Sequence, residues 1–141
     1  MSLFRWSSAY SVYLPEIDAE HRAIFQLGHQ LQKAMLAGAS PDRLKPILDN
    51  LMEAKEQHFR HEERLMRAMH YDALAWHKQL HDAARKRSKA LVKRIENGDT
   101  AATGELLQYL SDWMRDHVSV PDRMMGAYLR NYLRVNTSYA S

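Results

Sequence analysis

The chain has 141 residues, which suits one domain with a single sizeable hydrophobic core and is too short for two domains. It contains no cysteine, so disulfides, thiolate metal sites, iron–sulfur clusters and thiol nucleophiles are excluded, and any metal must be held by nitrogen and oxygen ligands. The formal net charge of +3 is a mild basic excess that does not indicate a nucleic-acid partner.

Neither a signal peptide nor a membrane span is predicted. The first residues, MSLFRWSSAYSVYLPEID, lack an uninterrupted apolar core, and no apolar run in the chain is long enough to cross a bilayer. We therefore expect a cytoplasmic protein that does not bind membranes.

The first predicted element is an arm over residues 1–16, in which aromatic residues lack helical spacing and Pro15 closes the segment. A helix is predicted from Ile17 onward, because apolar residues then recur at steps of three and four until a glycine ends the pattern. Asp18 is the expected cap of this helix. His21 lies on its inward stripe, near the start.

A second helix is predicted after Ser40 and Pro41, since a serine cap followed by proline is typical of a helix start. Two polar residues, His58 and Glu62, interrupt its apolar stripe. A spacing of four residues turns through about 400° on an α-helix, so these side chains stand one above the other on nearly the same face. This is a chelating geometry.

A third helix is predicted after Asp72, its expected cap, and its inward stripe carries His77 and His81 at the same four-residue spacing. The pair would supply the other half of a metal clamp. Basic residues fall away from this stripe and are interpreted as a solvated face; they are Arg85, Lys86, Lys89 and Lys93.

A fourth helix is predicted to start at Asp99, Thr100 or Thr103 and to carry His117 inward before Pro121 interrupts the pattern. Its inward positions include Leu106, Leu110, Trp113, Met114 and Val118.

The predicted fold class is all-α, because the chain shows no plausible strand pair, repeat or low-complexity tract. Four helices with short links imply an up-down-up-down four-helix bundle over residues 17–120. A short C-terminal helical segment over residues 122–135 follows the bundle. With the non-helical N-terminal arm, these parts form one domain spanning residues 1–141.

This topology brings the polar residues of the four inward stripes to one end of the bundle. Imidazole nitrogens and a carboxylate that converge between helices are what a buried transition-metal site needs. The alternative is a set of hydrogen-bonded core residues without a metal, but burying so many imidazoles in that way would be costly. The converging residues are His21, His58, Glu62, His77, His81 and His117.

Asp122 has two interpretations. It lies five residues beyond His117, about 140° away from the same face of a regular helix. On periodicity alone, Pro121 and Asp122 are better explained as a helix end followed by a cap. Because proline has no N–H for the carbonyl of His117, however, a kink or a widened turn could swing Asp122 back towards the site.

The ordered pattern H, HxxxE, HxxxH, HxxxxD resembles that of the hemerythrin family, in particular single-domain bacterial hemerythrins (bacteriohemerythrins). The segments IDAEH, HFRHEERLM and WMRDHVSVPD also match, and the resemblance covers roughly residues 6–130. It favours the second interpretation of Asp122. The residues that carry the pattern are His21, His58, Glu62, His77, His81, His117 and Asp122.

The resemblance implies two iron ions that bind dioxygen reversibly. One iron would take three histidines and the other two, which leaves the second iron an open position for dioxygen. By the same resemblance the ligands are His77, His81 and His117 for the first iron, His21 and His58 for the second, and Glu62 and Asp122 as bridges beside a solvent-derived oxo or hydroxo group.

Helical phase and the resemblance together predict an apolar dioxygen pocket, in which Phe59 and Trp113 are the stronger pair. Each pocket residue is equally an ordinary core residue. Met114 and Val118 stand where bulkier branched residues are often found in the family. The predicted pocket residues are Ile24, Phe59, Trp113, Met114 and Val118.

Three further histidines are not predicted as ligands. His29 and His70 are interpreted as surface or helix-end residues, and His61 as a residue at the edge of the site.

The expected function is dioxygen carriage, storage, delivery or sensing, with no catalytic residues. The alternatives are a di-iron redox enzyme acting on peroxide or nitric oxide, and iron storage or detoxification. A protein partner could bind the C-terminal segment near Tyr128 and Tyr132, and no oligomeric state is predicted.

Overall fold

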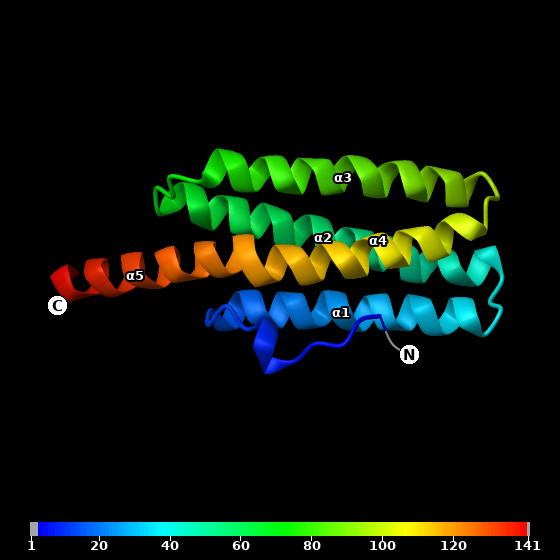
Figure 1. The fold of residues 1–141 in the computed structure, drawn as a ribbon, viewed down its shortest axis with the longest axis horizontal. Helices are drawn as coiled ribbons and strands as arrows, with labels where there is room; N and C mark the ends of the chain where they lie inside the picture. The colour runs from blue at the N-terminus through cyan, green and yellow to red at the C-terminus, as the bar shows by residue number, and fades with distance from the viewer. Residues whose placement is uncertain (1–2, 141) are drawn as a thin grey trace.

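A computed structural model describes the backbone of residues 3–140 and the side chains of residues 3–136. Four antiparallel helices pack side by side, as Figure 1 shows, and the predicted all-α up-down-up-down bundle is confirmed. No strand occurs within the described residues. The bundle helices are α1 (Pro15–Leu36), α2 (Pro41–Ala68), α3 (Leu74–Glu96) and α4 (Ala101–His117).

The C-terminal segment is a fifth helix, α5 (Arg123–Ala140), joined to α4 by the π-helical turn η2 (Val118–Asp122). The chain remains helical throughout this junction. As a result, α5 continues the line of α4 and extends beyond the ends of the other helices (Figure 1).

The helix starts differ from the sequence prediction in detail. α1 begins at Pro15, so Asp18 lies inside the first turn and is not the cap. Its carboxylate instead accepts hydrogen bonds from the Val12 N–H at 2.9 Å and the Ser11 hydroxyl at 2.6 Å, and thereby holds the arm. Asp72 is not a cap either, because Ala73 is the residue that precedes α3.

The predicted cap residues of α2 and α4 stand at the helix starts but do not cap them through their side chains. Ser40 and Pro41 do start α2, and Thr100 precedes α4, but neither polar side chain makes a capping hydrogen bond.

The N-terminal arm runs alongside α1 (Figure 1) and contains one short 3₁₀ turn, η1 (Ser8–Tyr10). Its backbone is held at Leu3, whose N–H donates to the Gln32 side chain at 3.0 Å and whose carbonyl accepts from the Ser111 hydroxyl at 2.8 Å. The arm thus links the first and fourth helices along the core.

The hydrophobic core runs the length of the bundle and includes residues from all four helices, the arm and α5. No helix within the described residues is long and apolar enough to cross a membrane. Among the largest fully buried side chains are Ile17, Leu31, Leu51, Met66, Leu91, Leu106 and Leu129.

Candidate metal centre

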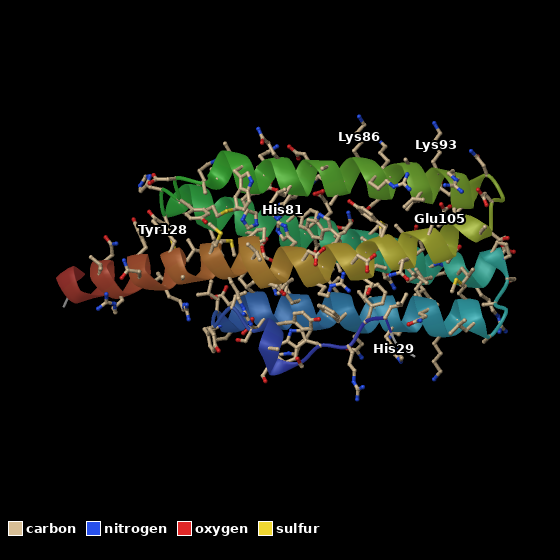
Figure 2. All side chains as sticks on the ribbon, viewed as in Figure 1. His29, His81, Lys86, Lys93, Glu105 and Tyr128 are labelled. Atoms are coloured by element: carbon tan, nitrogen blue, oxygen red, sulfur yellow. The ribbon has the colours of Figure 1, made fainter. Side chains whose placement is uncertain are left out.

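Each bundle helix brings its polar positions to the same end of the core. His21 lies near the start of α1 and His117 at the end of α4, and both side chains are buried. Figure 2 shows His81 of α3 in the space between the helices, whereas Lys86 and Lys93 of the same helix point outward. The outward orientation of these lysines agrees with the predicted solvated face.

The prediction of a solvated face was wrong for Arg85. Its side chain is only 24% exposed and is turned towards Glu56 and Glu63 of α2, because these carboxylates pair with the guanidinium.

The seven predicted ligands form two groups that overlap. Within each group, one potential ligand atom from every residue lies within 4.8 Å of the others. Glu62 and Asp122 belong to both groups. The first group adds His77, His81 and His117, and the second adds His21 and His58.

Glu62 faces both groups with different oxygens. Its Oε1 atom lies 3.1 Å from His81 Nε2 and 3.5 Å from His77 Nε2. Its Oε2 atom lies 3.3 Å from His58 Nε2 and 3.8 Å from His21 Nε2. The carboxylate therefore spans the space between the two groups.

Asp122 has the same divided arrangement on the other side of the cluster. Its Oδ1 atom lies 3.0 Å from His117 Nε2 and 3.1 Å from His77 Nε2. Its Oδ2 atom lies 3.1 Å from His21 Nε2. Two carboxylates, each with one oxygen toward each group, are suited to bridging two neighbouring cations.

The π-helical turn η2 explains how Asp122 reaches the cluster. A π turn accommodates one more residue than an α turn, so a residue five positions after His117 returns to the same face. Pro121 lies within this turn and has no N–H to complete an α-helical bond to the His117 carbonyl. The widened turn that the sequence allows is present.

Several of the potential ligand atoms at the centre lack hydrogen bonds. Although the ring nitrogens and carboxylate oxygens lie close together, several of them have no hydrogen-bond partner among the described residues. Orphaned buried polar atoms are rare and costly in proteins, and an ion that binds them removes that cost. Those atoms are His21 Nε2, His81 Nε2, both oxygens of Glu62 and both oxygens of Asp122.

The histidines differ in pKa when no metal is bound. Burial alone would lower the pKa of His58, but the neighbouring carboxylates of Glu62 and Glu20 raise it to about 10. Burial would also lower the pKa of His77, but the carboxylates of Asp122 and Glu62 raise it to about 9. A metal must therefore displace protons from both imidazoles at neutral pH.

His117 and the two carboxylates need no proton to be displaced. Burial lowers the pKa of His117, which keeps this imidazole neutral. Burial would raise the pKa of Glu62, yet His58 holds it well below the usual range. Burial and the charge of Glu62 would also raise the pKa of Asp122, but His117 and His21 outweigh them and lower it. Both carboxylates are thus ionised and able to bind cations.

A family model described as the hemerythrin HHE cation binding domain matches residues 13–129. The chain belongs to the hemerythrin family. Relatives named bacteriohemerythrin include one from Ralstonia nicotianae, 30% identical over 92% of this chain and 90% of its own length. Another, from Clostridium acetobutylicum, is 28% identical over 86% of this chain and 97% of its own length.

Animal relatives and solved structures agree with this assignment. Myohemerythrin-1 of Phascolopsis gouldii is 25% identical over 83% of this chain and 87% of its own length. The crystal structure of a hemerythrin point mutant aligns with a TM-score of 0.84 and 25% identity, over 92% of this chain and 98% of that chain. The predicted likeness to bacterial hemerythrins is confirmed.

Two acidic residues of this hemerythrin-family chain contact candidate ligands but were not predicted from the sequence. Glu20 lies 2.6 Å from Nδ1 of His58 and Glu63 lies 2.8 Å from Nδ1 of His81, so each carboxylate accepts the proton on the far side of a candidate ligand. Such a hydrogen bond fixes the ring orientation and the tautomer that exposes Nε2 to a metal. The only sequence feature that could have indicated this role is that Glu20 and Glu63 stand next to the predicted ligands His21 and Glu62.

The three histidines outside the pattern are placed as predicted. His29 and His70 are exposed, and Figure 2 shows His29 on the outer side of α1. His61 is half-buried, and its Nδ1 lies 2.6 Å from Glu20, the carboxylate that also contacts His58.

The predicted pocket residues all lie in or against the hydrophobic core. Phe59 stacks on the His81 ring with centroids 4.0 Å apart, and Trp113 stacks on the His117 ring at 4.1 Å. These two aromatics therefore cover ligands of the three-histidine group. Ile24, Met114 and Val118 are buried as well.

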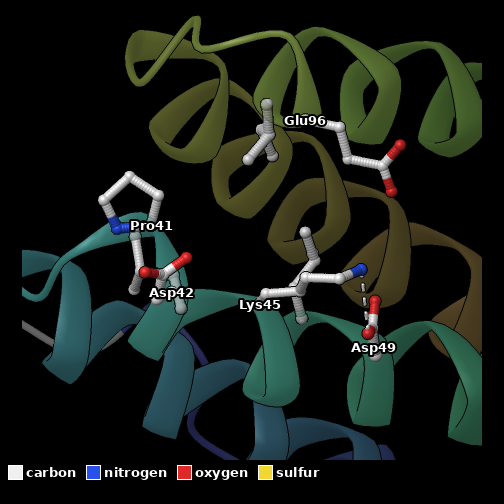
Figure 3. Close-up of a pocket in the computed structure, with 8 residues that line it drawn as sticks. Pro41, Asp42, Lys45, Asp49 and Glu96 are labelled. Atoms are coloured by element: carbon white, nitrogen blue, oxygen red, sulfur yellow. Dashed lines mark hydrogen bonds and ion pairs between the residues drawn. The ribbon is translucent and has the colours of Figure 1, made fainter.

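Two surface hollows differ in their relation to the cluster. Figure 3 shows one between the start of α2 and the end of α3, where Lys45 Nζ lies 3.3 Å from Asp49; it is at the opposite end of the bundle from the histidines. A groove of about 330 Å³ adjoins the cluster itself and is lined by Trp76, Leu80, Trp113, Asp116, His117 and Pro121.

Proposed function

We propose that this chain binds dioxygen reversibly at a non-haem di-iron centre. The observation that carries the proposal is the division of Glu62 and Asp122 between two ligand groups, because shared carboxylates are suited to two metal ions and not to one. The relatives named bacteriohemerythrin and myohemerythrin support it.

The proposed ligands differ in number between the two irons. Three histidines would hold one iron and two would hold the other, with both carboxylates as bridges and an oxo or hydroxo group beside them. When bound, the iron pair would supply an open position and two electrons for dioxygen. The three-histidine set is His77, His81 and His117, and the two-histidine set is His21 and His58.

The ligand set supports reversible binding over irreversible oxidation. Five imidazoles contribute no charge when neutral, so the two carboxylates are the only anionic side chains in the set. A site with this low negative charge stabilises highly oxidised iron less than a carboxylate-rich site does. We therefore propose binding and release, without a catalytic residue.

An apolar surrounding should protect bound dioxygen from water and protons. Four buried side chains and the half-buried Trp113 fit that role. The proposed pocket residues are Ile24, Phe59, Trp113, Met114 and Val118.

Anaerobic loading tests the proposal. Reduced apoprotein is loaded with ferrous iron, iron is counted per chain, and absorption spectra are recorded through repeated cycles of dioxygen addition and removal. Two irons per chain and a spectrum that forms and disappears with each cycle are expected. Immediate irreversible oxidation or a single iron per chain would overturn reversible binding.

A further inference from the structure

The His81 imidazole is held by a chain of charged groups that begins with Glu63. The Oε2 atom of Glu63 accepts from His81 Nδ1 at 2.8 Å, and the same oxygen lies 2.9 Å from Nη1 of Arg85. Glu63 is itself buried. Its carboxylate is therefore fixed between an imidazole and a guanidinium.

Arg85 is also anchored by two other carboxylates. Its Nε atom donates to Glu56 at 2.6 Å, and its Nη1 atom donates to Asp82 at 2.8 Å. Glu56 and Glu63 belong to α2, whereas Arg85 and Asp82 belong to α3. The guanidinium thus links the helix of Glu62 to the helix that carries His77 and His81. A planar fork with several donors is suited to such a junction.

The face of the His81 ring is held as well as its edge. Phe59 lies against it with an angle of 5° between the two planes and 4.0 Å between the centroids. Arg85 Cζ and Lys55 Nζ lie 5.3 Å and 5.1 Å from the Phe59 centroid, within the range of cation–π attraction. Arg85 therefore contacts both supports of His81, the carboxylate and the aromatic ring.

The two-histidine group has a looser support. Glu20 accepts from His58 Nδ1 at 2.6 Å, but the Glu20 side chain is 33% exposed and also accepts from His61. Each group also contains one histidine whose Nδ1 atom has no hydrogen-bond partner among the described residues, His21 in this group and His77 in the other. Arg85 thus supports one group through a network anchored by three carboxylates, of which Glu63 is buried, while the other relies on the single, half-buried carboxylate of Glu20.

We infer that Arg85 is a positioning residue of the metal centre, which acts through Glu63 and Phe59 to hold His81 so that the three-histidine group retains its metal longer than the two-histidine group. The inference rests on the proposed binuclear site but not on dioxygen binding. The network raises the cost of turning His81 away, which is the first movement needed for a metal to leave. Groups that orient ligand histidines typically change metal affinity by about 10–100-fold.

Release of cobalt(II) tests this inference. Apoprotein loaded with two cobalt ions is mixed with excess chelator, and the cobalt absorption is followed with time. Two phases are expected for the unaltered chain, and His117→Gln should abolish the slow one. Arg85→Met and Glu63→Gln should accelerate the slow phase about tenfold or more, while Glu20→Gln should accelerate the fast phase.

Two matched variants separate positioning from general damage. Arg85→Lys keeps a positive charge near Glu63 but lacks the planar guanidinium with its several donors. The rate of its slow phase should therefore lie between those of the unaltered chain and Arg85→Met. Lys86→Met, on the exposed neighbour in α3, should change neither phase. A slow phase unaffected by Arg85→Met, or equal acceleration of both phases, would overturn the inference.

The result is independent of the dioxygen experiment. If the slow phase responds as expected but the iron-loaded chain oxidises irreversibly, the positioning role stands and the proposed function fails. If dioxygen binding is reversible but Arg85→Met releases cobalt like the unaltered chain, the proposed function stands and the positioning role fails.

Discussion

Asp122 Oδ1 lies 3.0 Å from His117 Nε2, although Asp122 is five positions after His117 along a continuous helical path. A regular α-helix would place these residues about 140° apart. The π turn brings them together, and Asp122 consequently reaches both ligand groups from the end of one helix. π turns are rare and occur frequently at functional sites.

Asp122→Asn should weaken binding of one metal. The substitution keeps the shape of the side chain but removes the charge that faces both groups, so affinity for the second metal ion should fall at least about tenfold. Spectroscopic titration with cobalt(II) measures this affinity. Asp116→Asn is the matched control, because Asp116 is an exposed aspartate at the end of α4, just before the turn that carries Asp122. Unchanged affinity and stoichiometry in Asp122→Asn would reassign Asp122 as a structural residue.

Gly28→Ala should destabilise the protein. A Cβ atom at this position would lie 2.6 Å from the ring of Phe4, a buried residue of the arm. The displaced ring should lower the free energy of unfolding by about 1–3 kcal/mol in urea titrations. Gly104→Ala provides the opposite control, because nothing lies within 4 Å of its Cβ and alanine favours the helix by about 1 kcal/mol. Equal effects of the two substitutions would contradict the proposed packing of the arm.

Lys55→Met should stabilise the protein at neutral pH. Lys55 is only 4% exposed, and burial lowers its pKa to about 8, so the folded state disfavours the charged ammonium. Replacement by an apolar side chain should raise the free energy of unfolding by about 1 kcal/mol or more. Chemical denaturation measures the change, with the exposed Lys86→Met as control. A loss of stability would show that attraction to Phe59 outweighs the cost of burial.

The stability of the metal-free protein should decrease in alkaline solution. His58 and His77 have pKa values raised to about 10 and about 9, so their protonation stabilises the folded state below their ordinary pKa near 6.5. This contribution is lost as the pH rises through 9 and 10. Denaturation of apo Lys55→Met from pH 6 to 10.5 isolates the effect, because Lys55 would add stability between pH 8 and 10.5. A flat profile would contradict the ion pairs.

The bundle was predictable because the inward stripes repeat at the helical period over long stretches. The same periodicity predicts His21, His58, His77 and His81 at one end of the bundle, since antiparallel helices have only one way to align their ends. Helix starts were less predictable. Asp18 caps no helix because its carboxylate binds the arm, and the path of the arm is set by packing of Phe4 and Val12 and not by local sequence.

The parts of the site that escaped prediction depend on contacts between helices. Glu20 and Glu63 lie one residue away from predicted ligands and therefore about 100° from the inward stripe. They reach His58 and His81 only because neighbouring helices present the Nδ1 side of each ring to them. The turn at Pro121 was ambiguous for a related reason. The missing N–H permits a widened turn, but the surrounding packing decides whether one forms.

Diffraction at the iron absorption edge from crystals of the iron-loaded protein tests the binuclear centre most directly. Two anomalous peaks are predicted between Glu62 and Asp122, one contacting His77, His81 and His117 and the other His21 and His58. A single peak, or two peaks that do not share both carboxylates, would contradict the account.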